Sequence, residues 1–140
     1  MRRLCFLFVL ALSISAREPL EQRIAHTDPS KYRPSKAVHD GAGEMAFTAL
    51  FDEHTLETNL QFLHRGVIYP KSGIGQHFHN QCEEMFVILD GEAQFTADGR
   101  TSILKGPAVA LCWMGHSHAI YNATDFLVVV SVCDSEDCGR

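Results

Sequence analysis

The sequence predicts an all-β fold, either a sandwich or a barrel, with a double-sheet jelly roll among the options. About eight short runs rich in β-forming residues follow one another between Glu44 and Cys133. Turn residues separate these runs at intervals of roughly 8–12 residues, a spacing typical of such folds. No helical period is sustained after residue 56. The length of 140 residues suits one domain.

Residues 1–16 are predicted to be a secretory signal peptide. Arg2 and Arg3 form a basic start, the apolar run LCFLFVLALSIS follows, and small residues end it at Ser15 and Ala16. Cleavage could follow either of these two residues. The apolar run is shorter than the roughly 20 residues of a membrane-spanning helix, and an uncleaved anchor is the alternative. We therefore expect a secreted or periplasmic protein.

The rest of the chain is predicted to form an arm, a barrel and a tail. Residues 17–43 are polar, contain prolines and glycines, and show no sustained period, as expected of an N-terminal arm. One short ordered piece is expected around Ser35 to His39. The β-barrel is predicted over residues 44–133, and residues 134–140 are predicted to be an acidic tail.

The strands are predicted from composition and turn residues. Residues 56–70 alternate apolar and polar side chains, as a half-buried strand does. Asp90-Gly91 and Asp98-Gly99 stand between apolar runs and predict hairpins, because type I′ turns need positive φ at both central residues. The other predicted strands are residues 44–51, 84–89, 92–97, 100–104, 108–113, 118–122 and 126–133.

Charge argues against a nucleic-acid partner. The formal net charge is −5, and loss of the predicted signal peptide would remove two arginines and make the chain more acidic. Nucleic-acid binding requires a basic surface that neutralises phosphates. No nucleic-acid partner is therefore expected. No segment after the signal peptide is apolar for long enough to cross a membrane.

Four cysteines remain after the predicted cleavage, and an exported protein can oxidise them. Cys82, Cys112, Cys133 and Cys138 allow three connectivities. Their number is small for a chain of this length, so we expect a fold stabilised by its core with at most one or two disulfides. Cys133 and Cys138 could close a small loop or remain exposed and reduced.

The stretch HFHNQCEE gathers residues that bind metals. His77 and His79 are two apart, so on a strand their side chains share one face. Glu84 follows five residues after His79, and a turn at Asn80 to Cys82 would let it face the same interior. On an extended strand, Glu84 shares one face with apolar residues, and Glu83 shares the opposite face with other apolar residues. Parity alone does not choose between the two glutamates.

A second histidine pair, His116 and His118, follows in the sequence GHSHAIYN. Three neutral imidazoles and one carboxylate suit a divalent transition metal, with bonds of roughly 2.0–2.2 Å. A buried carboxylate without a partner is costly, and a metal cation relieves that cost. The two histidine pairs and a glutamate therefore predict a metal site inside the β-fold.

The stretch GIGQHFHNQCEEMFVILDG resembles the first motif of the cupin superfamily. His77, His79, Glu84 and Gly91 match its spacing, which favours Glu84 over Glu83 as the ligand. The leading glycine of the motif falls at Lys71, and nearby glycines could replace it. The resemblance implies a small double-stranded β-helix, or jelly-roll barrel, over about residues 60–130.

The second cupin motif is only partly matched. Gly115, His118 and Asn122 match it, whereas its proline position holds Trp113 and its first glycine position holds Pro107. The departures put the turn before His118 in doubt more than His118 itself. By resemblance, the metal ligands would be His77, His79, Glu84 and His118, with Glu83 as the substitute for Glu84. Manganese, iron, zinc and nickel all tolerate this ligand set.

Other residues near the motifs are assigned less direct roles. We expect His116 to lie in the pocket or behind the ligands rather than to bind the ion. Cys82 is interpreted as a small, half-buried hydrophobe rather than a thiolate ligand. Gln81 or Asn122 could accept a hydrogen bond from a bound imidazole. The residues expected to line the pocket around a small substrate are His116, Trp113, Tyr121, Phe78 and Phe86.

Fold resemblance does not determine the reaction. The first hypothesis is a metal-dependent enzyme of dioxygenase, decarboxylase or isomerase type that acts on a small molecule, since the ligand set leaves two positions open on a six-coordinate ion. The second is a non-enzymatic protein that binds a small molecule or sugar with the metal as a clamp. The third is a scaffold whose metal only stabilises the barrel. A homodimer is expected to cover any open sheet edge.

Overall fold

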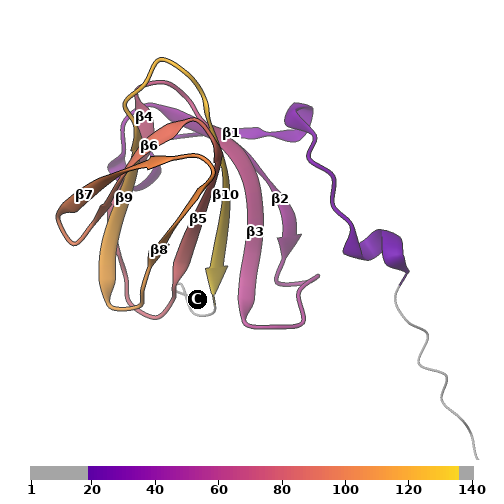
Figure 1. Ribbon diagram of the computed structural model, residues 1–140. Helices are drawn as coiled ribbons and strands as arrows, with labels where there is room; N and C mark the ends of the chain where they lie inside the picture. The colour runs from indigo at the N-terminus through magenta and orange to yellow at the C-terminus, as the bar shows by residue number, and fades with distance from the viewer. Residues whose placement is uncertain (1–18, 136–140) are drawn as a thin grey trace, which may run out of the picture.

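The computed structural model describes residues 19–135 (Figure 1). The predicted signal peptide and most of the predicted acidic tail lie outside these residues. Among the described residues, no helix is long and apolar enough to span a membrane. The strands are β1 (Arg33–Lys36), β2 (Glu44–Asp52), β3 (Leu60–Ile68), β4 (Ser72–His79), β5 (Glu84–Asp90), β6 (Glu92–Ala97), β7 (Arg100–Lys105), β8 (Ala108–Cys112), β9 (His116–Asn122) and β10 (Val128–Ser135).

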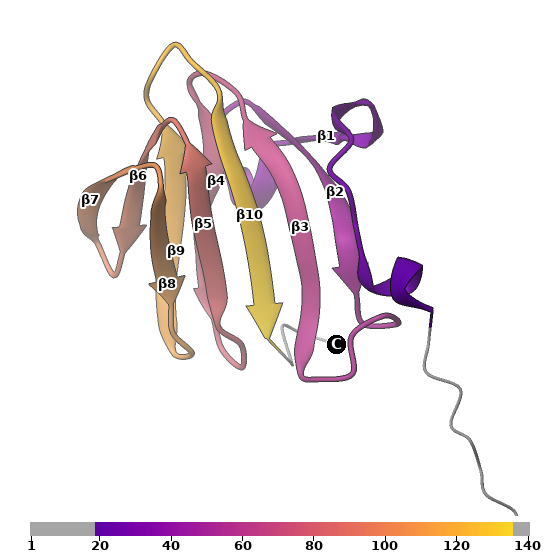
Figure 2. The ribbon, with the colours of Figure 1, turned by 45° about the vertical axis from the view of Figure 1, so that its right-hand side comes forward.

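The strands form two antiparallel sheets packed against each other. The larger sheet has the order β1-β2-β3-β10-β5-β8, and the smaller has the order β4-β9-β6-β7. Figure 2 shows β8, β5, β10, β3 and β2 side by side across the larger sheet. The predicted all-β fold is confirmed, and its two layers are those of a double-stranded β-helix.

The core fills the space between the two sheets. Along β5 every second side chain is buried, and its neighbours face outward, as the two-residue period of a strand requires. The buried apolar side chains of the larger sheet include Ile68, Phe86, Ile88, Val128 and Val130, and those of the smaller sheet include Ile74, Phe95 and Ile120. Burial of both inner faces is the main source of stability for such a fold.

One of the two predicted hairpins is confirmed and the other is wrong. Asp98 and Gly99 have φ of 48° and 75° and join β6 to β7, which pair with each other. Asp90-Gly91 instead joins β5 to β6, which belong to different sheets. At this point the chain crosses the sandwich. A Cβ on Gly91 would lie 2.7 Å from the carbonyl oxygen of Leu127, so the glycine is needed for close packing as well as for its positive φ.

The segment predicted to be an arm carries three short 3-10 helices and a strand: η1 (Leu20–Arg23), η2 (Pro29–Lys31), β1 and η3 (Val38–Asp40). β1 pairs with β2 at the edge of the larger sheet. The η3 segment lies along β4, where the amide of Gly73 donates to the carbonyl of Ala42 over 2.8 Å. A Cβ on Gly75 would lie 2.0 Å from the carbonyl oxygen of His39. Gly75 therefore allows η3 to approach the smaller sheet.

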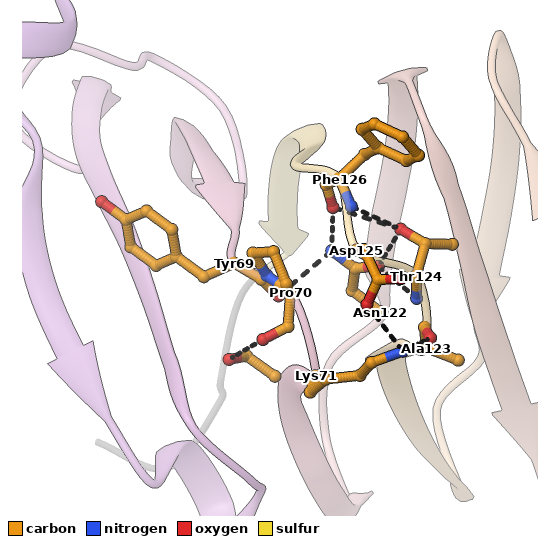
Figure 3. A network of polar contacts seen from close by, with 9 residues as sticks. Tyr69, Pro70, Lys71, Asn122, Ala123, Thr124, Asp125 and Phe126 are labelled. Carbon is orange, nitrogen blue, oxygen red and sulfur yellow. Dashed lines mark hydrogen bonds and ion pairs between the residues drawn. The ribbon is translucent and has the colours of Figure 1, made fainter.

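Asn122 fixes two loops at one end of the sandwich (Figure 3). Its side chain is fully buried. The amide nitrogen donates to the carbonyls of Ile68, Tyr69 and Phe126 over 3.0, 3.1 and 2.7 Å. Its oxygen accepts from the amide and hydroxyl of Thr124. Asn122 thus ties the β3–β4 turn to the β9–β10 loop, and these bonds do not involve a histidine.

Candidate metal centre

The four predicted metal ligands are brought together from both sheets. His77 and His79 lie on β4, and His118 lies on β9 directly opposite His77 in the strand register. Side chains opposite each other on neighbouring strands share a face, and here that face is the interior. β4 ends at His79, and residues 80–83 carry the chain across to the larger sheet. Glu84 begins β5 there and points back at the histidines.

The ligand atoms converge closely. The Nε2 atoms of His77 and His79 lie 3.0 Å apart, those of His79 and His118 2.8 Å, and those of His118 and His77 3.1 Å. The Oε2 atom of Glu84 lies 2.7, 3.4 and 3.7 Å from the Nε2 atoms of His118, His79 and His77. All four potential ligand atoms therefore fall within 4.8 Å of one another. Glu83 is exposed and takes no part in the group.

This geometry fits a divalent transition metal. Ligands adjacent on an octahedral ion lie about 3 Å apart when the bonds are about 2.1 Å, and the three nitrogens have this separation. Glu84 Oε2 is buried and accepts no well-formed hydrogen bond within residues 19–135. A carboxylate oxygen buried against three lone-pair nitrogens is costly without a cation. The donor set suits manganese, iron, nickel or zinc.

The second ring nitrogens show how the histidines are oriented. His77 Nδ1 lies 3.0 Å from the carbonyl oxygen of Gly75, so Nδ1–H donates there and Nε2 presents its lone pair. His79 Nδ1 contacts the sulfur of Cys82 at 2.9 Å. His118 Nδ1 is buried and has no hydrogen-bond partner within the described chain. Asn122 and Gln81, the predicted acceptors, are not the groups that hold these rings.

The charges of the group are coupled through Glu84. Burial raises the pKa of Glu84, but the close imidazoles of His118, His77 and His79 outweigh burial and hold this pKa well below its usual range. Burial lowers the pKa of His118 despite the carboxylate. Burial also lowers the pKa of His77, but the Glu84 carboxylate outweighs burial, so that the pKa of His77 is raised. The carboxylate is therefore ionised at neutral pH and available to a cation.

Two cavities meet at the ligand group. The inner cavity, of about 190 Å³, lies between the sheets and is lined mainly by apolar side chains of β2, β3, β4 and β10. The outer cavity, of about 480 Å³, lies beside the loop that follows β4. His39, Phe62, His77 and Glu84 line both cavities. A small molecule bound at the ligand group would thus have space on either side of it.

The predicted pocket residues mostly lie elsewhere. Only Phe78 lines a cavity beside the ligand group, and this is the outer cavity. Phe86 is fully buried in the core. His116 is exposed, and its Nδ1 pairs with Asp98 Oδ2 at 2.6 Å. Trp113 is 61% exposed, and Tyr121 lines neither cavity. His116 has the same strand parity as His118, but it is the first residue of β9, where it is exposed and pairs with Asp98 instead of facing the ligand group.

Two histidines to which the sequence patterns assigned no functional role line the inner cavity. The ring of His39 stacks on His77 with centroids 3.7 Å apart and planes 9° apart. His64 stacks on Phe62 and Phe47 at 4.0 and 4.9 Å. The alternation of β3 puts His64 on the same face as Phe62, and this pattern could have indicated that His64 faces the interior. No local pattern marks His39, because η3 reaches β4 through a tertiary contact.

Cys82 and Asp134 form a further group with His79. The three potential ligand atoms lie within 4.8 Å of one another, and all three residues are buried. Cys82 is disulfide-bonded, so its sulfur is not a thiolate ligand. The expectation that Cys82 is not a thiolate ligand agrees with the disulfide, and the residue is buried more deeply than expected. Cys112 is a free, buried cysteine. The predicted Cys133–Cys138 loop involves side chains outside those described.

Comparison with known proteins finds one sequence relative and many similar structures. No family model matches the sequence. The chain is 29% identical over 97 residues to an oxalate-binding protein of Thermotoga maritima, covering 66% of this chain and 80% of that protein. A crystal structure of a predicted oxalate decarboxylase from Thermotoga maritima has a TM-score of 0.74 at 22% identity, covering 80% of this chain and 99% of the other.

Two further similar structures are named as cupin proteins. The cupin domain of Schizosaccharomyces pombe Cnp3 has a TM-score of 0.63 at 16% identity, over 80% of this chain and 74% of that chain. A cupin 2 conserved barrel domain protein from Salinispora arenicola has a TM-score of 0.57 at 18% identity, over 86% and 87%. The predicted fold is therefore confirmed: this chain has the cupin fold, a double-stranded β-helix.

Proposed function

We propose that this protein is a metal-dependent enzyme that acts on a small organic acid. The observation that carries the proposal is the convergence of three imidazole nitrogens and one buried carboxylate at about the spacing of ligands around a single ion. His77, His79, Glu84 and His118 would hold a divalent manganese, iron, zinc or nickel ion. The ion would supply Lewis-acid or redox chemistry at positions that the protein leaves open.

The relatives and the site support a small organic acid as the substrate. One relative is named an oxalate-binding protein, and a similar structure is named a predicted oxalate decarboxylase. Carboxylate oxygens bind readily to ions held by histidine and glutamate. The cavities beside the ligand group have room for a small acid. A decarboxylase-, dioxygenase- or isomerase-like reaction fits such a substrate.

The protein's own residues would bind and orient the acid. Glu84 and the three histidines fix the ion, and the apolar wall of the inner cavity keeps water from one side of it. His39 covers one face of the His77 ring and so limits its rotation. Gly75 accepts from His77 Nδ1 and keeps Nε2 directed at the ion.

The second candidate function is binding of a small molecule or sugar without turnover, with the metal as a clamp. The relative named for oxalate binding favours it. Both functions share the ion and the carboxylate contact, and they differ in whether the acid is consumed. A structural metal alone is disfavoured, because cavities open on both sides of the ligand group.

Metal content and turnover distinguish these functions. The protein is purified, its metal is measured by mass spectrometry, and oxalate, other small acids and catechols are tested for binding, carbon dioxide release and oxygen uptake. Consumption that stops on chelation supports the enzyme, and saturable binding without consumption supports the clamp. His77→Ala and His118→Ala should lose the ion, whereas His26→Ala, remote from the group, should keep it. Equal metal in all three variants contradicts the proposal.

We also propose that the protein is exported and forms a homodimer. The N-terminal sequence supports export, and detection of a chain beginning near Arg17 outside the cytoplasm tests it. β8 is an edge strand of the larger sheet. Its outward side chains Val109 and Leu111 are exposed beside Met85 of β5. A second copy could cover this apolar edge, and light scattering of wild type and Leu111→Lys tests it.

A further inference from the structure

The inner cavity is unlike a site built only for a compact, fully polar acid. Most of its wall is apolar, from Met45 and Phe47 of β2, Phe62 of β3 and Val130 and Val132 of β10. Its volume of about 190 Å³ exceeds the roughly 150 Å³ of an engineered cavity that accepts benzene. Apolar walls of this size favour a ligand with an apolar body, because burial of such a body is the driving force.

The cavity has a polar group away from the ion. His64 is half-buried and lines the wall of the inner cavity. Its ring lies between Phe62 and Phe47, with interplanar angles of 12° and 21°. Neither ring nitrogen of His64 has a hydrogen-bond partner among residues 19–135. The stack fixes the ring plane, so the nitrogens can meet a polar atom of a ligand at low entropic cost.

Burial also keeps this imidazole neutral. Burial lowers the pKa of His64, and the distant Glu84 carboxylate only partly opposes that effect. A neutral imidazole both donates and accepts a hydrogen bond. It therefore suits a hydroxyl or carbonyl on the ligand better than a second carboxylate, which would call for a cation. This distinguishes the inner cavity from a site for a small dianion.

We propose that the ligand is a monocarboxylic acid with a compact ring or branched apolar body and one hydroxyl or carbonyl group at the far end. The carboxylate lies toward the ion held by His77 and Glu84, the apolar body fills the inner cavity, and the distal oxygen bonds to His64. This inference rests on the proposed function for its metal contact. It makes His64 a specificity-determining residue.

Three probe acids test the proposal on the metal-loaded protein. Benzoate, 4-hydroxybenzoate and oxalate are titrated by calorimetry. We expect 4-hydroxybenzoate to bind about fivefold more tightly than benzoate, as one added hydrogen bond predicts, and both to bind more tightly than oxalate. Binding of oxalate with no binding of either ring acid overturns this inference and leaves the proposed function standing. Absence of any bound metal overturns both.

Variants locate the hydrogen bond. His64→Phe keeps an aromatic ring in the stack and removes both nitrogens, so the preference for 4-hydroxybenzoate over benzoate should disappear. His54→Phe, at an exposed histidine, is the matched control and should keep it. Metal content is measured first in each variant, so that loss of the ion is not mistaken for loss of a contact. A preference unchanged in His64→Phe overturns the role of His64.

A milder variant covers the case in which His64→Phe does not fold. Phe62→Leu removes one ring of the stack and leaves the histidine in place. We expect it to weaken both ring acids by a similar factor, with the hydroxyl preference retained. Unaltered affinity for both ring acids would show that they do not occupy the inner cavity and would overturn the proposal.

Discussion

At the scale of single residues, the two adjacent glutamates differ sharply in environment. Glu84 faces three imidazole nitrogens inside the sandwich, whereas Glu83 faces outward. Substitution Glu84→Gln removes the negative charge and one oxygen ligand, so metal affinity should fall by at least about tenfold. Glu83→Gln makes the same chemical change next to it and should not alter affinity. Metal titration of the two variants decides the matter, and equal losses would show that the ligand assignment is wrong.

Cys112 provides a second prediction at this scale. It is a free, buried thiol, and burial raises its pKa to about 11 from the usual value of about 9. The thiolate is the reactive form, so Cys112 should resist alkylation at pH 8 in the folded protein and react once the protein is unfolded. Peptide mapping after iodoacetamide treatment measures this. Rapid modification of the native Cys112 peptide would contradict the burial argument.

The same thiol predicts the direction in which the stability of the protein changes at alkaline pH. Because its pKa is higher in the folded state, the folded protein retains the proton longer than the unfolded chain does as the pH rises. The contribution of Cys112 to stability is therefore fully present below about pH 9 and falls as the pH rises toward about 11. Cys112→Ala should flatten this part of the stability curve in chemical denaturation experiments.

At the scale of elements, Asn122 joins two turns that would otherwise have buried carbonyls without partners. Asn122→Ala removes the two N–H groups that together serve three carbonyls and should cost about 3 kcal/mol of stability, since each buried group left unpaired costs roughly 1–3 kcal/mol. Asn59→Ala, at an exposed asparagine, is the control and should change stability little. Urea unfolding measures both. A small loss in Asn122→Ala would mean that water replaces the amide.

The elements also show how far the sequence predicts the fold. The long alternating and β-rich runs were recognised because their patterns are local, and β2, β3 and β5 follow them. β4 was not predicted as a separate strand, because Gly73 and Gly75 weaken its strand signal. These glycines are required by partners distant in sequence, the backbone of β9 and that of η3. Such tertiary requirements leave no periodic pattern.

The same distinction applies to the site. The motif spacing predicted the four residues that the structure brings together, because a strand, a turn and a second strand are enough to place them. The cavity walls were predicted less well. They depend on η3 and on the inner faces of β2, β3 and β10, whose residues meet only in the folded sandwich. Trp113, an aromatic residue close to the motif, therefore lines neither of these two cavities.

At the scale of the whole molecule, the ligand group joins the two sheets. β4 and β9 of the smaller sheet supply three histidines, and β5 of the larger sheet supplies Glu84. An ion bound only by the folded state would therefore stabilise the entire sandwich. At a free metal concentration of 100 times the Kd, the gain is about 2.7 kcal/mol. For a domain of this size that gain corresponds to a rise in Tm on the order of 10 °C.

Acid should remove this stabilisation, and the sign can be derived for each group. The lowered pKa of Glu84 keeps its carboxylate ionised until well below pH 4.5, so Glu84 does not limit binding near neutrality. The lowered pKa of His118 means that the unfolded chain takes up its proton first, which costs stability as the pH falls below about 6.5. The raised pKa of His77 has the opposite effect on the stability of the metal-free protein. It stabilises the folded state at low pH, and this contribution is lost as the pH rises past that pKa.

The comparison of metal-loaded with metal-free protein separates these effects. A proton on His77 must leave before the ion binds, so the raised pKa extends competition by protons toward neutral pH. We therefore expect the difference in Tm between the two forms to grow steadily from pH 5 to pH 8. Scanning calorimetry across this range measures it, with His77→Ala as the variant in which the difference should be small at every pH. A difference that stays constant with pH in the wild type would mean that the ion binds without displacing a proton, and so binds elsewhere.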